Sequence, residues 1–304
     1  ELMTPPTVSN PTLWLVWTLF IAIGLPFFVL STTSPLIQKW FSHVGHHTSH
    51  DPYYLYAASN VGSLLALLSY PFIIEPNIGL SAQKSVWSVG YIGLILFIAI
   101  CAWYFVRNYQ KADAPEQQEA EVSAPSILVK LHWLALAFVP SSLLLGLTNF
   151  VSTDIAAVPL LWIIPLTLYL FSFVLVFSRW AKPIHKASVL LQPIVLLPFI
   201  AYSFINPAIL PYWLDLTLHL SAFFLAVMVC HGELAKSRPH TAYLTLFYLI
   251  MSFAGMLGGM FNTFVAPFIF NGIYEYPLMI VAALLLRPAI QKQGSEQWKS
   301  WGMQ

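Results

Sequence analysis

Nine apolar stretches follow one another along the chain, separated by short polar segments. Most hold about 20 residues, which is the length that an α-helix needs to cross a hydrocarbon core of about 30 Å. The pattern predicts an all-α protein, a polytopic transmembrane helix bundle of about nine spans. The predicted spans cover residues 11–30, 53–74, 86–106, 127–150, 157–177, 187–205, 212–230, 241–265 and, in a shorter run, 274–286.

One polar segment, residues 108–126, has the composition of a linker. Its KADAPEQQEAEVSAPS is acidic and rich in Ala and Pro, which is typical of a solvated, flexible segment. We therefore predict a first transmembrane bundle at 1–107 and a cytoplasmic linker at 108–126. A second bundle at 127–287 and a cytoplasmic tail at 288–304 follow.

Basic residues fall almost entirely in alternate connections between the predicted spans. Twelve of the 13 share one side, and only Lys84 lies on the other. Because Lys and Arg are retained on the cytoplasmic side, we predict an outside N-terminus and a cytoplasmic C-terminus. The twelve are Lys39, Arg107, Lys111, Lys130, Arg179, Lys182, Lys186, Lys236, Arg238, Arg287, Lys292 and Lys299.

Two of the predicted spans share a motif. Five residues of the span at 53–74 recur in the same order in and just after the span at 241–265, six spans later. The pairs are Tyr56 with Tyr248, Ser59 with Ser252, Gly62 with Gly255, Pro71 with Pro267 and Phe72 with Phe268. A parallel six-helix repeat is the plan of major-facilitator transporters, and it would place three further helices before Glu1. Chance similarity between Gly- and Ser-bearing membrane helices is the alternative.

Long blocks of the sequence resemble the membrane portion of the fused major-facilitator/spermidine-synthase-like proteins. The resemblance covers about residues 24–288 and includes GLPFFVLSTTSPLIQKWF, DPYYLYAASNVGSLLALLSYPFIIEP, LTNFVSTDIAAVPLLWIIPLTLYLFSFVLVF and HGELAKSRPHTAYLTLFYLIMSFAGMLGGMFNTFVAPFIF. It implies a major-facilitator-like bundle, which we expect in a bacterial inner membrane. In that family a soluble aminopropyltransferase-like domain follows the helices. No G-x-G-x-x-G follows a strand in these 304 residues, so we expect neither that activity nor a cofactor.

Composition supports a membrane protein. Hydrophobic residues make up 58% of the chain and charged residues 8%, against about 25% charged in an ordinary soluble domain. The formal net charge is +1, so the chain offers no basic surface for nucleic acid. We therefore expect the lipid bilayer to be the principal partner of this chain.

Ionisable residues within the predicted spans are the first candidates for function, because a charge is costly inside a bilayer. Asp215 and His219 are four positions apart, which places them on one face of a helix as a candidate proton relay. An interfacial Asp215 is the alternative. Glu75 and Glu275 fall at the outer ends of their spans, where they either cap the helix or snorkel to the interface, or face a vestibule for a cation such as a polyamine.

Two polar segments on the cytoplasmic side contain further candidates. In the segment SHVGHHTSHD the histidines have a spacing that would place several of them on one face of a helix, which makes a weak candidate metal site. Gly45 argues against a rigid helix there. The candidate ligands are His43, His46, His47 and His50. In CHGELAKSRPH, Glu233 is a candidate conformational latch with Lys236 or Arg238. A basic turn that only sets the topology is the alternative.

These observations favour a transporter-like membrane module that recognises a small cation such as a polyamine. The alternative is a non-transporting accessory or scaffold subunit that packs against other membrane subunits. Unpaired apolar faces on the first three predicted spans would favour the subunit, and a polar cavity that holds Asp215 would favour transport. No nucleophile and base stand in a recognisable catalytic arrangement, so we do not expect an enzyme.

Overall fold

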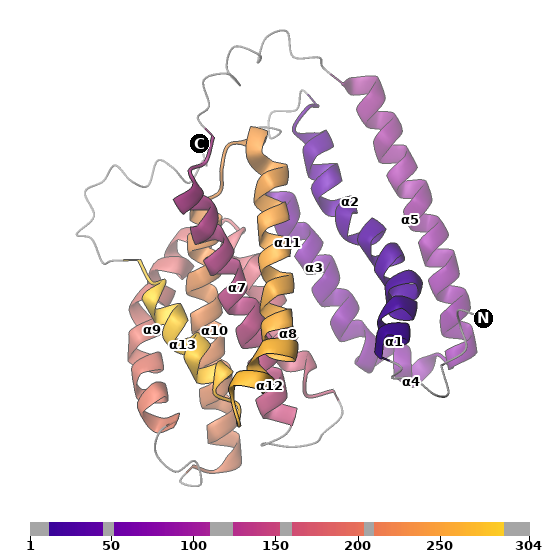
Figure 1. Cartoon of the computed structure of the whole chain (residues 1–304). Helices are drawn as coiled ribbons and strands as arrows, with labels where there is room; N and C mark the ends of the chain where they lie inside the picture. The colour runs from indigo at the N-terminus through magenta and orange to yellow at the C-terminus, as the bar shows by residue number, and fades with distance from the viewer. Residues whose placement is uncertain (1–11, 45–51, 110–123, 153–159, 204–209, 289–304) are drawn as a thin grey trace.

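The computed structural model describes residues 12–44, 52–109, 124–152, 160–203 and 210–288 (Figure 1). Within these ranges the chain forms helices and no β-strand, apart from one isolated bridge between Val44 and Tyr109. The prediction of an all-α protein is therefore confirmed for the described residues. The longer helices are α1 (Thr12–Leu19), α2 (Leu25–Phe41), α3 (Tyr54–Ser69), α5 (Leu80–Asn108), α7 (Ile127–Phe150), α8 (Ile163–Val176), α9 (Ala181–Ser203), α10 (Tyr212–Lys236), α11 (Leu244–Met260) and α13 (Glu275–Leu285).

Six helical segments of the described chain are long and apolar enough to cross a membrane. They are Tyr54–Asn77, Leu80–Asn108, Ile127–Phe150, Ala181–Ser203, Tyr212–Lys236 and Thr241–Ile269. A pair bent by 42°, Trp14–Gly24 and Pro26–Phe41, raises the number to seven if it forms one span. Helices pair their backbone N–H and C=O groups internally, as a hydrocarbon core requires. The described chain is thus a helical membrane bundle. Helices α8 and α13 are also apolar but have only 14 and 11 residues, so nine spans stay a prediction.

Three of the apolar helices contain a five-residue π-helical turn. The turns are η1 (Phe20–Gly24) before α2, η2 (Tyr70–Ile74) before α4 (Glu75–Asn77) and η6 (Phe261–Val265) before α12 (Ala266–Ile269). A proline lies in or just after each turn, at Pro26, Pro71 and Pro267. Proline has no N–H to donate and crowds the preceding turn, which favours local widening of the helix. The two spans that share the sequence motif therefore also share an α–π–α order.

The core of the bundle lies around α7, α10 and α11. Helix α10 packs on α7, α8, α9 and α13, and its Phe223, Ala226 and Val227 are fully buried. Helices α7 and α11 approach closely at Gly258, where an added Cβ would lie 2.9 Å from the Phe138 carbonyl oxygen and the Ser141 Cβ. Small residues permit such close backbone contact between membrane helices.

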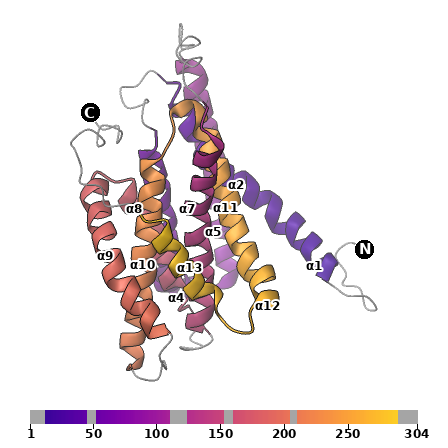
Figure 2. The same ribbon diagram turned by 60° about the vertical axis from the view of Figure 1, so that its left-hand side comes forward.

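The first three predicted spans lie at the edge of the bundle. Helix α5 contains no buried residue, and Figure 1 shows it along one side of the molecule. Figure 2 shows α1 projecting away from the other helices. On α3, a Cβ added at Gly62 would meet no atom within 4 Å, so this glycine is not used in packing within the described chain. The apolar faces of α1 and α5 therefore point outward, whereas α3 also packs on α8.

Contacts between connecting segments gather the basic connections at one end of the bundle, which we call the cation-rich end. The Tyr53 hydroxyl, just before α3, donates to the Pro239 carbonyl after α10 at 2.9 Å. The Trp133 indole of α7 donates to the Ser237 carbonyl at 3.1 Å. The end of α2 meets the end of α5 through the Val44–Tyr109 bridge. Lys84, near the start of the 29-residue α5, lies at the opposite end.

Candidate functional site

Asp215 and His219 lie on the same face of α10, as their spacing predicts. The His219 Nε2 is 3.5 Å from the Asp215 Oδ1, and the Tyr202 hydroxyl at the end of α9 donates to the same oxygen at 3.0 Å. The side chains of Asp215 and His219 are 16% and 8% exposed. A carboxylate that accepts from a tyrosine and faces an imidazole can hold or pass a proton.

Aromatic rings from three other helices enclose the His219 imidazole. It stacks on Phe150 of α7 at 4.2 Å and on Tyr276 of α13 at 5.6 Å, and it meets the Phe199 ring of α9 edge-on at 4.8 Å. The Tyr276 hydroxyl donates to the backbone carbonyl of His219 at 3.4 Å. We call this group, together with Asp215 and Tyr202, the Asp215 cluster. Its π faces and carboxylate are chemically suited to an organic cation.

The two glutamates predicted at the outer ends of their spans differ in environment. Glu275 begins α13, is only 6% exposed and directly precedes Tyr276 of the Asp215 cluster. Glu75 begins α4 and is exposed. Figure 1 shows α4 well apart from α13. The structure therefore brings Glu275, and not Glu75, towards the predicted Asp215–His219 pair.

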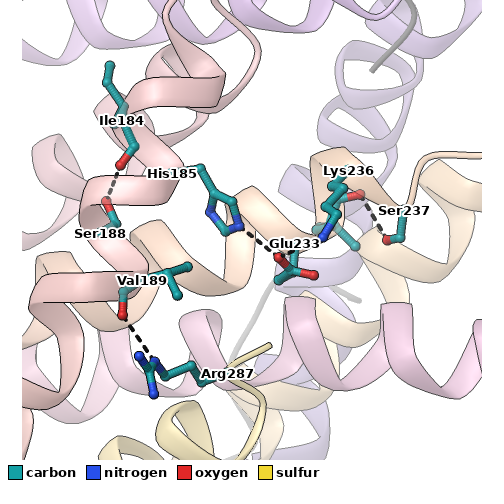
Figure 3. A network of polar contacts seen from close by, with 9 residues as sticks. Ile184, His185, Ser188, Val189, Glu233, Lys236, Ser237 and Arg287 are labelled. Atoms are coloured by element: carbon teal, nitrogen blue, oxygen red, sulfur yellow. Dashed lines mark hydrogen bonds and ion pairs between the residues drawn. The ribbon is translucent and has the colours of Figure 1, made fainter. Parts of the chain in front are cut away.

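The candidate latch residue Glu233 lies in a polar network at the cation-rich end of α9 and α10 (Figure 3). Its Oε1 is 2.7 Å from the His185 Nε2 of α9 and 3.6 Å from the Lys236 ammonium. A Cβ at Gly232 would overlap the His185 ring, so this glycine lets the imidazole lie against α10. The predicted Lys236 contact is present, but the closest partner is His185, which lies on another helix and was not predicted.

Arg238, the other predicted partner of Glu233, lies against an aromatic ring of the first half of the chain. Its guanidinium lies 5.0 Å from the centre of the Tyr53 ring, at the start of α3. Glu233 and His185 both belong to the second predicted bundle, whereas Tyr53 belongs to the first. Arg238 therefore contacts the first predicted bundle at this end, where the Tyr53 hydroxyl also donates to the Pro239 carbonyl.

The predicted histidine-rich metal site falls mostly outside the described residues. His46, His47 and His50 lie there. His43 is described at the end of α2, where its Nδ1 is 2.9 Å from the Lys39 carbonyl oxygen and its ring stacks on Tyr109. Among the described residues, no group of three or more His, Cys, Asp or Glu side chains could hold a metal ion.

Comparisons of the chain with protein-family models, with curated proteins and with solved structures gave no match. The fold and composition define the class of protein to which the chain belongs. The chain is an integral membrane protein built from apolar α-helices, with at least six helices long enough to span a bilayer among the described residues.

Proposed function

We propose that this chain is a transporter-like membrane module that recognises a small organic cation such as a polyamine and couples its movement to a proton. The observation that carries the proposal is the Asp215–His219 pair, enclosed by aromatic rings of α7, α9 and α13 within the apolar helical bundle. Ionisable residues are expensive at such positions and commonly mark substrate or proton pathways.

The same proposal includes a major-facilitator-like arrangement of nine spans with a partial six-helix repeat, related to the fused spermidine-synthase-like proteins. The shared α–π–α order of the segments that begin with α3 and α11 supports the repeat, because their π turns follow helices that carry the same motif residues. We further propose that the cation-rich end faces the cytoplasm of a bacterial cell, which is the orientation that the positive charges favour.

Proton-driven uptake into proteoliposomes tests this function. We expect the purified chain to accumulate radiolabelled spermidine under an imposed pH gradient, and we expect Asp215→Asn to reduce that uptake at least tenfold, because the amide cannot take up the relayed proton. Glu75→Gln is the matched control, since Glu75 is exposed and outside the Asp215 cluster. Uptake by Asp215→Asn at the wild-type rate would contradict the proposed coupling.

A second candidate function is an accessory subunit of a larger membrane complex. The outward apolar faces of α1 and α5 favour it, because a helix such as α5, with no buried residue, has surface available for another protein. Purification from the native membrane in nanodiscs separates the two functions. A stoichiometric complex that shows no spermidine uptake would support the accessory subunit.

A further inference from the structure

A cavity of about 350 Å³ lies between helices of the first predicted bundle, along the half of α5 that is farther from the cation-rich end. Helix α5 forms one wall, through residues spaced three and four apart on one face. The segment from η2 to the end of α4 forms the opposite wall, and α2, which contacts α5, contributes Leu30. We call this cavity the α5 groove. Its lining includes Tyr70, Ile78, Gln83, Trp87, Gly90 and Leu94.

The surface of the α5 groove is almost entirely apolar. The Gln83 side chain is its one amide, and the Nε2 of this residue already donates to the Ile78 carbonyl oxygen at 2.7 Å. That hydrogen bond ties the start of α5 to the opposite wall. Among the described residues that line the groove, none is charged. Such a lining favours hydrocarbon, because a polar solute would lose its hydrogen bonds with water there.

The α5 groove is open towards the surroundings of the bundle. Helix α5 contains no buried residue, so the wall that it forms is accessible from outside. A Cβ added at Gly90, within this wall, would meet no atom within 4 Å. Because the chain is an integral membrane protein, the molecules that reach such an apolar opening are those of the lipid bilayer.

The length of the α5 groove matches one leaflet of a bilayer. Gln83 and Leu94 are 11 residues apart on α5, which is about 17 Å by the rise of an α-helix. One leaflet contributes about 15 Å, half of the hydrocarbon core of about 30 Å. Trp87 is exposed near the Gln83 end, as is typical of tryptophan at a membrane interface. A single acyl chain of one leaflet therefore fits along the groove.

A lysine lies beside the Gln83 end of the groove. Lys84 directly follows Gln83, precedes Trp87 by one helical turn and is exposed. None of the described residues forms an ion pair with it. Lysine carries its charge on a flexible four-carbon stem and binds phosphate as a point charge. Glu75, on the opposite wall segment, does not line the groove. The charge at this end of the groove thus complements a phosphate.

We infer that the α5 groove is a binding site for a phospholipid. One acyl chain lies along α5 from Gln83 to Leu94, and the phosphate of the same molecule pairs with the Lys84 ammonium. This site belongs to the first predicted bundle, and it does not depend on the proposed transport of a cation. It gives one face of α5, a helix without buried residues, a defined ligand.

Photocrosslinking of the full chain in nanodiscs tests this site. The probe is phosphatidylglycerol with a diazirine in one acyl chain, present as a small fraction of the lipid, and labelled residues are identified by mass spectrometry. We expect Gly90→Leu, which fills the groove, to reduce labelling of the groove residues at least fivefold. Gly93→Leu is the matched control and should leave that labelling unchanged, because Gly93 also faces open space but does not line the groove.

Substitutions of Lys84 test the phosphate contact without altering the groove itself. We expect Lys84→Gln to reduce labelling of the groove residues at least threefold and Lys84→Arg to retain it, because arginine keeps the positive charge. Labelling that persists in Lys84→Gln but is lost in Gly90→Leu would show a hydrocarbon chain without a phosphate contact, and would overturn the assignment of a phospholipid.

Lipid that only surrounds the bundle would give a different result. Leu96 is exposed on the other side of α5 and reports on such lipid. Equal labelling of Leu96 and Leu94 that does not change in Gly90→Leu would overturn the binding site. These measurements do not involve spermidine uptake, so the failure of this inference and the failure of the proposed function are distinguishable.

Discussion

Gly258 shows how one missing side chain can hold two membrane helices together. The Ser141 hydroxyl donates to the Gly255 carbonyl at 2.9 Å, and the Asn262 amide donates to the Ser142 hydroxyl at 2.7 Å. These interhelical bonds form because the backbones of α7 and α11 approach closely between them. In lipid, where apolar burial favours association only weakly, such packing and hydrogen bonding stabilise the helix pair.

We therefore predict that Gly258→Ala destabilises the chain. The new methyl group would overlap α7, and overpacking of this kind costs about 1–3 kcal/mol. That cost exceeds the gain of about 1 kcal/mol from the higher helix propensity of alanine. Unfolding in mixed detergent micelles with increasing SDS measures the change. Gly93→Ala on α5, where a Cβ meets no atom within 4 Å, is the control and should leave stability equal or slightly higher.

The polar residues differ in how far the sequence could predict them. Asp215 and His219 lie four positions apart on one helix, so local geometry alone predicted their contact. His185 and Glu233 come from different helices, and so do Ser172 and His231. Such pairs depend on how α8, α9 and α10 pack. One sequence carries no signal for how these helices align, and therefore it predicts neither the Ser172–His231 contact nor the His185–Glu233 contact.

At the scale of elements, helix α5 differs from the helices of the core. It is continuous over 29 residues, yet it has no buried residue and contacts few elements of the described chain. Helix α7, by contrast, is buried along one side against α10, α11 and α13. Apolar length predicted both helices equally well, because hydropathy reports transfer into lipid and not contact with protein. Their different roles follow from packing alone.

Truncating the same residue type on each helix should reveal this difference. Leu143 of α7 is fully buried, and Leu143→Ala would leave a cavity that costs about 2 kcal/mol, the low end of the usual range, because lipid removes most of the transfer contribution. Leu96 of α5 is 60% exposed, and Leu96→Ala should change the free energy of unfolding by less than about 0.5 kcal/mol. A large loss in Leu96→Ala would show that α5 packs against protein in the purified sample.

For the whole molecule, the alternation of basic connections and the packing of the helices agree. The charges alone predicted that the connections after 30, 106, 177 and 230 share one side. The structure brings several of these connections into contact, through Tyr53 with Pro239 and Trp133 with Ser237. Folding thus concentrates the basic residues at the cation-rich end. The side of the membrane that this end faces can be measured by labelling a residue at each end of one helix.

The two ends of α5 provide that measurement. Ser81 and Asn108 are both exposed and 27 residues apart on one helix, about 40 Å by the rise of an α-helix. In a chain without Cys101 and Cys230, we expect Ser81→Cys to react with a membrane-impermeant maleimide in intact cells and Asn108→Cys to react only after lysis. The reverse pattern would place the cation-rich end outside the cell. Labelling of both cysteines in intact cells would show that α5 does not cross the membrane, because a spanning helix cannot expose both ends to one compartment.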